Sequence, residues 1–458
     1  MRRILPASEY GIALQKLSVQ EKKQTAETIL HASEELMRRY SAERTVLLCD
    51  EPLHEIAFRS ADMLRERERG SVVALLSRDE LPDLSHGVIC DLLFPSACSK
   101  SRLQKREEWI RAMAKESCPI LSVAIPAGVD PDTGRAKQFA VQAEITVAPG
   151  AYLRGLLLHD GLDHCGEIRP VGGEVERGDG LFRFEGPDAN RLLPPRKRTA
   201  HKGDSGKALL CVGSPKYIGA ALLSARACLA AGCGILFVAC PDEVRTALGR
   251  LPEAIGIPVG RDWNEESCLL AIQALEGMKA LGLGCGVGGG DISSLLEAAL
   301  RTGLPLVMDA DGLNCLSRHP RLYPLLHEKV ILTPHPGEMS RLTGLPSDTI
   351  LDTPVDCAVR YARQWGCTVL LKGAATVVSD GTRTRIVAEG NAGLGKGGSG
   401  DALTGIITGL LSQGVEPFAA ACLGSYLLGT SAVKAFELLK ERMLRATHVI
   451  EALEDWNE

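Results

Sequence analysis

Short apolar runs alternate with longer amphipathic stretches along the first 170 residues of the chain. The apolar runs cover residues 45–49, 71–76, 87–94, 120–125 and 144–148, and each has the length of a buried strand. Residues 18–40 and 102–115 lie between such runs and have the character of helices. Strands that alternate with helices at this spacing predict a parallel sheet joined by right-handed crossovers.

A second α/β pattern fills the C-terminal half. A loop over residues 214–219 precedes a helix of small residues that begins at Ala220, and an apolar helix begins near Asp401. This order predicts a doubly wound α/β layout, in which ligands bind at the carboxyl ends of the strands. Its strands are predicted at residues 208–213, 234–239, 279–283, 305–309, 330–332 and 368–371, with a hairpin at 376–387.

The sequence between the two patterns differs from both. It is rich in glycine, proline and charged residues, and it ends in the run LLPPRKR at residues 192–198. Such composition is typical of a linker or a surface excursion, although one or two strands of the second domain can fall within it. We therefore predict a first domain over residues 1–175, a linker or boundary segment over 176–197, and a second domain over 198–458.

Residues 220–240 are the stretch that most resembles a membrane span. They contain Arg226 and many small residues, and the apolar pattern breaks at Gly232 and Gly234 before a short β-like run. A buried helix followed by a buried strand explains this pattern better than a bilayer-spanning helix does. We therefore expect no membrane association.

Composition agrees with a two-domain soluble protein. A chain of 458 residues is too long for one ordinary core, and its 45% apolar and 24% charged residues are typical of globular proteins. The net charge of −5 gives no basic footprint for nucleic acid or an anionic membrane surface. A protein of this kind usually acts on small molecules.

The fifteen cysteines indicate a reducing compartment rather than a disulfide framework. No Cys-x-x-Cys pair with zinc spacing occurs, and the N-terminus lacks the apolar run of a secretory signal. We expect reduced thiols and a cytoplasmic location. Six of the cysteines stand in runs of apolar or small residues, where cysteine packs as a small hydrophobe: Cys211, Cys228, Cys233, Cys240, Cys285 and Cys422.

The strongest candidate for chemistry is the segment NAGLGKGGSGD at residues 391–401. Its five glycines allow backbone N–H groups to approach a ligand, and the helix that follows directs its positive end toward the same place. Asp401 at the start of this helix is then a candidate general base, which takes a proton from a substrate hydroxyl as that hydroxyl attacks phosphorus. The alternative is a flexible turn with Asp401 as an ordinary helix cap.

Several other predicted strands end in polar or glycine-rich motifs. Lys372 and Thr376 follow one strand and suit phosphate contacts, or they form only a turn. His335 lies between two prolines in a loop that suits substrate recognition or is only a connector. Asp309 and Asp311 suit Mg²⁺ binding through water, with helix capping by Asp311 as the alternative. Glycine-rich loops at residues 213–220 and 281–286 complete the set, and we expect all five to meet at one edge of the sheet.

Together these motifs resemble those of the ADP-dependent NAD(P)H-hydrate dehydratases, which are similar in fold to ribokinase-like small-molecule kinases. The resemblance implies that ADP, with Mg²⁺, phosphorylates the hydroxyl of the S epimer of NADHX or NADPHX. Elimination of phosphate then restores NADH or NADPH. The motifs are HKGD at 201–204, GS at 213–214 with Tyr217 and GAA at 219–221, Gly282 with Gly286, DAD at 309–311 with Asn314, TPHPGE at 333–338, KG at 372–373 with Thr376, and GGSGD at 397–401.

The resemblance also implies roles for individual residues. The catalytic group is Asp401, with Gly398, Ser399 and Gly400 stabilising charge, and the hydrate is held by Ala220, Gly286, His335 and Asp401. Before GGSGD the chain has Leu394, Gly395 and Lys396 where the family usually has Met-Ala-Thr, so that Lys396 either strengthens diphosphate binding or points to solvent. The implied ADP contacts are Lys372, Gly373, Ala374, Ala375, Thr376, Asn391, Ala392, Gly393, Leu394, Gly395, Lys396, Gly397, Gly398, Ser399 and Gly400.

The N-terminal half resembles the NAD(P)H-hydrate epimerases that are fused to such dehydratases, which implies a Rossmann-like three-layer fold. The similarity rests on LSVAIPAGVDPDTG at residues 121–134. Ala124 stands where the family has the expected acid/base aspartate, and the loop at residues 49–57 has no glycine with which to cradle a phosphate. Asp91 alone remains of the family's K⁺ site, beside Pro95. We expect a folded domain that has lost epimerase activity and K⁺.

Two other functions fit the residues less well. A ribokinase-like kinase of another small alcohol would use the same phosphate-binding parts, with the N-terminal half as a non-catalytic docking or assembly domain. A protein that only senses nucleotide would need no intact catalytic motifs. The resemblance also suggests a homo-oligomer, possibly a tetramer.

Overall fold

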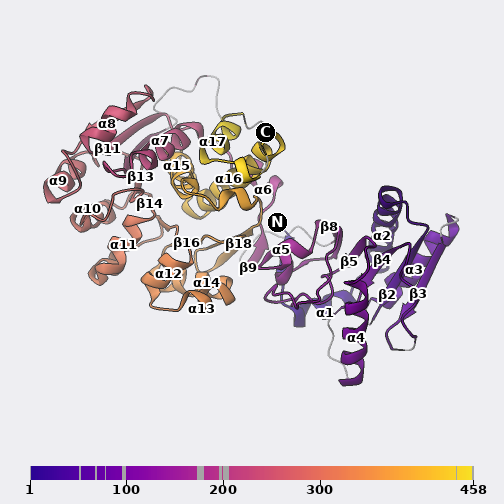
Figure 1. The fold of residues 1–458 in the computed structure, drawn as a ribbon. Helices are drawn as coiled ribbons and strands as arrows, with labels where there is room; N and C mark the ends of the chain where they lie inside the picture. Colours follow the sequence, from indigo (N-terminus) through magenta and orange to yellow (C-terminus); the bar gives the residue numbers. More distant parts are fainter. Residues whose placement is uncertain are drawn as a thin grey trace. The chain divides into compact units, whose positions relative to one another are not determined.

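The computed structural model describes residues 2–50, 53–67, 70–77, 79–94, 100–172, 180–194, 199, 206–439 and 441–455. The chain divides into two compact units, of which unit 1 holds residues 1–177 and 181–183 and unit 2 holds residues 178–180 and 184–458. The HKGD motif at 201–204, Pro95 and residues 51–52 of the loop at 49–57 lie outside the described residues. The two units are therefore described separately (Figure 1).

Unit 1 is a parallel α/β sandwich of the kind that the sequence predicts. Its six-stranded sheet has the order β3-β2-β4-β5-β6-β8, and every neighbouring pair is parallel. The strands are β2 (Arg44–Cys49), β3 (Gly70–Leu75), β4 (Gly87–Leu92), β5 (Ile120–Val123), β6 (Ile145–Pro149) and β8 (Glu167–Val171), and the helices are α1 (Ala7–Gln15), α2 (Val19–Tyr40), α3 (His54–Glu66), α4 (Lys100–Met113), η1 (Arg154–Leu157) and α5 (Gly161–His164).

Alternation along the strands of unit 1 places helices on both faces of the sheet. Val46 and Leu48 of β2 pack with Trp109 of α4 on one face. The side chain of Thr45, one residue along, faces the opposite side and reaches Met37 of α2. The sheet is thus the middle of three layers. A smaller ribbon of three strands completes the unit, with β1 (Arg2–Leu5) parallel to β7 (Tyr152–Leu153) and antiparallel to β9 (Gly180–Arg183).

Unit 2 contains a nine-strand sheet of order β12-β11-β10-β13-β14-β15-β16-β17-β18, parallel as far as β16 and antiparallel at β17 and β18. Its strands are β10 (Lys207–Cys211), β11 (Ile235–Cys240), β12 (Ala254–Pro258), β13 (Ala280–Leu283), β14 (Leu306–Met308), β15 (Val330–Leu332), β16 (Thr368–Leu371), β17 (Thr376–Ser379) and β18 (Arg383–Val387). Its helices are α6 (Gly186–Leu192), α7 (Ile218–Ala230), α8 (Asp242–Leu248), α9 (Glu265–Gln273), α10 (Ser293–Arg301), α11 (Asp311–Arg318), η2 (Pro320–Leu325), α12 (Pro336–Thr343), α13 (Ser347–Asp352), α14 (Pro354–Trp365), η3 (Ala392–Leu394), α15 (Ser399–Ser412), α16 (Pro417–Leu438), η4 (Glu441–Met443) and α17 (Ala446–Glu454).

Helices α7 and α15 cross unusually closely on one face of this sheet (Figure 1). A Cβ atom added at Gly405 would lie 2.2 Å from the carbonyl oxygen of Ser224, and one at Gly409 would lie 2.6 Å from that of Cys228. The two glycines lie one turn apart on the same side of α15, so that only hydrogen fits where the backbones meet. This contact fixes the position of α7 relative to the start of α15.

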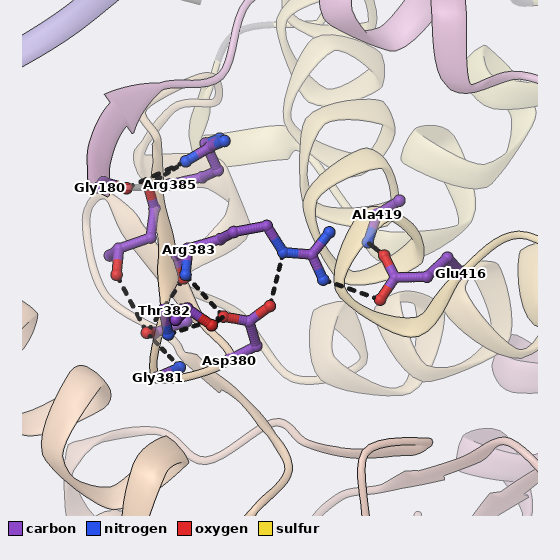
Figure 2. A network of polar contacts seen from close by, with 10 residues as sticks. Gly180, Asp380, Gly381, Thr382, Arg383, Arg385, Glu416 and Ala419 are labelled. Carbon is purple, nitrogen blue, oxygen red and sulfur yellow. Dashed lines mark hydrogen bonds and ion pairs between the residues drawn. The ribbon is translucent and has the colours of Figure 1, made fainter. Parts of the chain in front are cut away.

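A network of charged side chains ties the β17–β18 hairpin to the start of α16 (Figure 2). Arg383 donates to Asp380 at 2.6 Å within the turn and to Glu416 at 3.0 Å, and Glu416 in turn accepts the N–H of Ala419. Buried Arg385 donates to the carbonyl of Gly180 at 3.1 Å. The antiparallel edge is thereby held against the helix layer.

The segment expected to be a linker at 176–197 is partly regular. Residues 180–183 form β9, and α6 follows. Phe184 and Ala189 are buried in the core of unit 2 around α15 and α16. Residues 173–179 and 195–198 lie outside the described part. The described part of this segment therefore contains one strand, which the prediction allowed for, and one helix, which it did not.

Residues 220–240 form α7 followed by β11, which confirms the predicted helix and strand. Another helix, α16, is long and apolar enough to cross a membrane, with a window of mean hydropathy 1.2. Since 72% of that window is buried within the protein, its pattern is that of a core helix.

Candidate active site

The loops that follow five strands of unit 2 meet at one edge of the sheet, as predicted. Strands β10, β13, β14, β15 and β16 are consecutive neighbours and parallel, so that their carboxyl ends share that edge. The start of α15 lies there too, because a Cβ atom added at Gly400 would lie 3.2 Å from Oδ2 of Asp309 and 3.5 Å from Nζ of Lys372. The glycine-rich segment and the charged exits of β14 and β16 thus form one site.

A buried ion pair lies at the centre of this edge. Nζ of Lys372, after β16, donates to Oδ1 of Asp309, after β14, at 2.7 Å, and it lies 3.7 Å from Glu338. Burial alone would lower the pKa of Lys372, but the charges of Asp309 and Glu338 outweigh burial and raise it. Lys372 is therefore a fixed cation at neutral pH. The turn expected at residues 372–376 is present, and its lysine points into the site.

The two carboxylates of the Asp-Ala-Asp motif, Asp309 and Asp311, bind different partners. Ala310 has φ of 48°, a left-handed conformation that is costly for a residue with a side chain. Asp309 accepts the N–H of Ala310 at 2.8 Å in addition to Lys372, whereas Asp311 accepts the N–H of Gly288 at 2.8 Å. Ala310, not Asp311, is the residue that precedes α11, so the helix-capping alternative for Asp311 is wrong.

Asp401 is the third residue of α15, and Gly398 is the capping residue. The alternative of an ordinary cap is therefore wrong for Asp401. Gly398 has φ of 99°, and a Cβ atom there would lie 2.6 Å from Leu223, so both conformation and space require glycine. Burial raises the pKa of Asp401 and the negative charge of Asp309 adds to the increase, while Lys372 opposes it.

The backbone at the start of α15 is suited to an anion. The first N–H groups of a helix have no carbonyl partner within the helix, and here the free ones belong to Gly400 and Asp401, while that of Ser399 makes only a long contact of 3.5 Å with the carbonyl of Lys396. Ser399 and Gly400 are half-buried, and Gly397 has open space around its Cα atom. A phosphate that approaches this end therefore meets free donors beside the Lys372 ammonium.

Ala220 and Gly286 are brought together from α7 and the loop after β13. Gly286 has φ of 66°, and a Cβ atom there would lie 2.6 Å from the Cβ of Ala220. The two residues pack so closely that only hydrogen fits at Gly286. His335 lies at the start of α12, where its Nδ1 accepts the N–H groups of Gly337 at 3.0 Å and Glu338 at 3.4 Å.

The rest of the expected nucleotide loop has its side chains engaged by protein. Asn391 donates to the carbonyl of Ala432 at 3.0 Å and accepts the N–H of Gly393. Lys396 donates to the carbonyls of Arg442 at 2.7 Å and Leu444 at 2.8 Å. Lys396 is exposed, but its Nζ atom is bonded to these two carbonyls and holds the loop against the segment before α17. Gly373 and Ala374 are exposed, Ala375 is buried, and Thr376 begins β17.

Three further residues belong to the site: Thr404, which was not predicted, and Ser214 and Cys285, which were predicted only as members of glycine-rich loops at strand ends. The hydroxyl of Thr404 donates to Oδ2 of Asp309 at 3.2 Å, and the thiol of Cys285 hydrogen-bonds Asp401. Ser214 is 3% exposed, and its hydroxyl has no partner among the described residues. Thr404 could have been predicted as a site residue, because it is a polar residue about one turn after Asp401 in an otherwise apolar helix. The other two were not distinguishable from ordinary small residues.

The corresponding edge of unit 1 is filled by its own side chains. Asp91 is fully buried and accepts hydrogen bonds from Leu93 N at 3.0 Å, Ser122 Oγ at 3.0 Å and Ala127 N at 2.7 Å. Burial raises the pKa of Asp91 from 3.8 to about 6. Asp50, after β2, forms a buried ion pair with Arg106 at 2.5 Å.

Ala124, after β5 of unit 1, is fully buried and has φ of 72°. The left-handed conformation is one that aspartate tolerates better than alanine does. A cavity of about 200 Å³ lies beside the following residues 126–131, with Arg106 and Arg135 in its lining. A cavity thus lies next to a residue whose methyl side chain cannot transfer a proton.

The fold of unit 2 is that of ribokinase-like proteins. A ribokinase-like superfamily protein from Enterococcus faecalis V583 matches with a TM-score of 0.54 at 24% identity, over 62% of this chain and 97% of that one. The ADP/ATP-dependent NAD(P)H-hydrate dehydratase from Bacillus subtilis, co-crystallised with ATP/Mg²⁺, matches with a TM-score of 0.51 at 30% identity, over 58% of this chain and 94% of that one.

Sequence comparison then identifies the family. Residues 208–454 match the NAD(P)H-hydrate dehydratase family, and residues 18–155 match the family described as YjeF-related protein N-terminus. The bifunctional NAD(P)H-hydrate repair enzyme of Moorella thermoacetica is 32% identical over 82% of this chain and 74% of its own length, and that of Escherichia coli K12 is 30% identical over 80% and 71%. The chain belongs to the family of bifunctional NAD(P)H-hydrate repair enzymes.

Proposed function

We propose that unit 2 dehydrates the S epimer of NADHX or NADPHX at the expense of ADP, and that unit 1 has no epimerase activity. The observation that supports the first statement is the closeness of the Lys372–Asp309 pair to Gly400, next to Asp401, because a Cβ atom added at Gly400 would lie within 3.5 Å of both side chains. It places a fixed cation, free N–H donors and a carboxylate of raised pKa at one point. Family membership and the fold of the Bacillus subtilis enzyme add support for nucleotide and Mg²⁺ binding.

The first step is transfer of the terminal phosphoryl group. The substrate hydroxyl oxygen forms a bond to phosphorus, the bond from phosphorus to the AMP oxygen breaks, and Asp401 takes the hydroxyl proton. The raised pKa of Asp401 makes it a better proton acceptor than an exposed carboxylate. The N–H groups of Ser399 and Gly400 and the ammonium of Lys372 stabilise charge on the phosphoryl oxygens.

The second step is elimination. The carbon–oxygen bond breaks, phosphate leaves with the electron pair, and the neighbouring carbon releases a proton as the double bond of the nicotinamide ring is restored. Hydroxide is a poor leaving group and phosphate is a good one, so the kinase-like first step makes the dehydration feasible. Ala220 and Gly286, which lie close together at this edge of the sheet, are the residues that would contact the ring of the hydrate.

Magnesium fits this edge through Asp311 rather than Asp309. Asp309 already receives Lys372, Ala310 N–H and Thr404 hydroxyl donors, which satisfies its two oxygens. Oδ1 of Asp311 accepts only a long hydrogen bond of 3.4 Å from Asn314. This oxygen therefore suits a contact with Mg²⁺ through a water molecule. The ion would neutralise charge on the phosphate oxygens of the bound nucleotide.

A direct assay tests the dehydratase. The purified chain is incubated with NADHX and ADP while the absorbance of restored NADH is recorded, with AMP in place of ADP as the control. We expect ADP-dependent recovery of NADH from the S epimer. If neither ADP nor ATP supports recovery while another small alcohol is phosphorylated, the chain is a kinase of the same superfamily and the proposal is wrong.

The second statement concerns the methyl group of Ala124, which neither accepts nor donates a proton. An NMR or chromatographic assay of R-to-S conversion, run without ADP, tests it on the intact chain. We expect conversion at the spontaneous rate, and the same rate for the Asp401→Asn variant. Conversion at an ordinary enzymatic rate would show that unit 1 uses another acid/base.

A further inference from the structure

Three metal-binding side chains converge outside the proposed catalytic site of unit 2. They are Asp291, at the end of the loop that joins β13 to α10, and Cys315 and His319 of the α11 region. One ligand atom from each residue lies within 4.8 Å of the others. Cys315 and His319 are four residues apart in sequence, which is the spacing that places two side chains on the same face of a helix.

The separations are close to those of a tetrahedral metal site. Sγ of Cys315 lies 3.9 Å from Oδ1 of Asp291, and Nε2 of His319 lies 3.8 Å from Oδ2 of Asp291. Zinc bonds of about 2.0 to 2.3 Å at tetrahedral angles separate ligand atoms by roughly 3.3 to 3.6 Å. Movements of a few tenths of an ångström would therefore bring Asp291 to a bonding position on an ion shared with either neighbour, while the ligand atoms of Cys315 and His319 lie within 4.8 Å of each other.

Neighbouring hydrogen bonds already orient two of the three ligands. Nδ1 of His319 lies 2.9 Å from the carbonyl oxygen of Cys315, which only accepts, so Nδ1 carries the proton. In the neutral ring Nε2 then has the lone pair and faces Asp291. Oδ1 of Asp291 accepts the N–H of Ser293 at 2.9 Å. A backbone carbonyl on the second nitrogen and a hydrogen-bonded carboxylate are the usual supports of metal-binding residues.

We propose that Asp291, Cys315 and His319 form a site for a divalent cation of the zinc class. One thiolate, one imidazole and one carboxylate suit Zn²⁺ or Co²⁺, whereas Mg²⁺ requires oxygen ligands. Asp291 is exposed, with 66% of its side chain accessible, so that the ion can enter from solvent and keep a water as its fourth ligand.

The position of this site links the metal to the substrate loop. The loop that ends at Asp291 also carries Gly286, which contacts Ala220, and Gly288, whose N–H binds Asp311. An ion between Asp291 and α11 would fasten the far end of the same loop to the helix that begins at Asp311. Bound metal should therefore stabilise unit 2 and restrict the loop, independently of the reaction that unit 2 carries out.

Metal binding itself provides the test. The intact chain is first treated with a chelator and exchanged into metal-free buffer, and Zn²⁺ binding is then measured by calorimetry and by the shift in the thermal transition. Co²⁺ is added in parallel, because a cysteine ligand gives a thiolate-to-cobalt absorption band. We expect one tight equivalent, a higher transition temperature with Zn²⁺, and the cobalt band.

Three variants identify the ligands. Cys315→Ser, His319→Gln and Asp291→Asn should each weaken Zn²⁺ binding at least about tenfold, and Cys315→Ser should abolish the cobalt band. Cys357→Ser, a buried cysteine of α14 outside the group, is the matched control and should retain both. Since Asp291 is exposed, Asp291→Asn keeps the test valid if a buried substitution impairs folding. Unchanged affinity in Asp291→Asn and His319→Gln, or no binding by the wild-type chain, would overturn the proposal.

Discussion

The two units of this chain use the same sheet architecture and treat the carboxylates at its edge in opposite ways. In unit 1, Asp91 is saturated by three protein donors and Asp50 by the Arg106 guanidinium. In unit 2, Asp401 is held beside a helix start with open glycine backbone around it, and its pKa is raised. Polar residues after parallel strands are therefore not enough to make a reactive site.

What distinguishes the two edges is where the unsatisfied hydrogen-bonding capacity remains. In unit 1 the carboxylates at the edge are hydrogen-bonded by protein donors. This stabilises the fold and leaves few hydrogen-bonding groups for a ligand. Unit 2 leaves N–H donors of α15 and a base without a full set of partners, which costs stability and favours ligand binding. The following variants test this contrast, from the largest expected effect to the smallest.

Asp401→Asn should reduce ADP-dependent turnover by about 10²- to 10⁴-fold, because the amide cannot accept the substrate proton. ADP affinity, measured by calorimetry, should change little, since the N–H donors and Lys372 remain. Asp348→Asn in the first turn of α13 is a control of the same chemistry at an exposed position and should be fully active. Full activity of Asp401→Asn would remove the proton acceptor from the mechanism.

Asp91 should make stability depend on pH in the direction opposite to that of a salt-bridged carboxylate. Its pKa is raised from 3.8 to about 6 in the folded state, so between these values the unfolded chain has lost a proton that the folded chain retains. The contribution of Asp91 to the free energy of unfolding therefore falls by about 3 kcal/mol as pH rises from about 4 to about 6, because its pKa changes by about two units on folding. Above this range the contribution is constant.

Urea unfolding of the wild-type chain and Asp91→Asn across this range measures the effect as a difference, in which other titrating groups cancel. Asp62→Asn, at a side chain that is 67% exposed, is the control and should follow the wild-type profile. Parallel profiles of stability against pH for wild type and Asp91→Asn would show that folding does not raise the pKa of Asp91.

Gly405→Ala should destabilise unit 2 by about 2 kcal/mol, because the new methyl group would meet the Ser224 carbonyl at 2.2 Å and force α7 and α15 apart. Thermal unfolding measures the loss. Gly219→Ala lies in the first turn of α7, has no atom within 4 Å of its added Cβ, and should be neutral or slightly stabilising. Equal melting temperatures for the two variants would mean that the helices are not constrained at their contact.

Ala124→Gly should be nearly neutral, within about 0.5 kcal/mol, because relief of the left-handed conformation offsets the lost methyl group and the added chain entropy. Ala148→Gly, at a buried alanine of β6 without such a conformation, should cost about 1.5 kcal/mol. The comparison is made by urea unfolding. A comparable loss in both variants would show that Ala124 is unstrained.

The sequence predicted the central strands better than the edge strands, for a physical reason. Strands such as β2 and β13 are buried on both faces and appear as apolar runs. The strands β8 and β12 form the outer edges of their sheets and are half-exposed, with the sequences EIRPV and AIGIP, and neither was predicted. An edge strand lacks the burial that produces the apolar pattern.

The sequence predicted which residues form the candidate site, but it did not predict the contacts that those residues make with one another. Asp309 and Lys372 were both selected, one for Mg²⁺ and one for phosphate, but their mutual ion pair was not foreseen. That pair joins residues 63 positions apart and depends on the order β14-β15-β16, which local pattern does not determine. The hydrogen bonds of Lys396 likewise depend on the path of the chain after α16.

Those hydrogen bonds make the segment after α16 a support of the proposed nucleotide loop. Lys396 donates to the carbonyls of Arg442 and Leu444, and a Cβ atom added at Gly393 would lie 2.5 Å from the Leu444 side chain. A fragment that ends with α16 would keep every recognisable motif and yet lack the support of the loop. Motif boundaries are therefore a poor guide for trimming this protein, and for judging which truncating mutations are harmless.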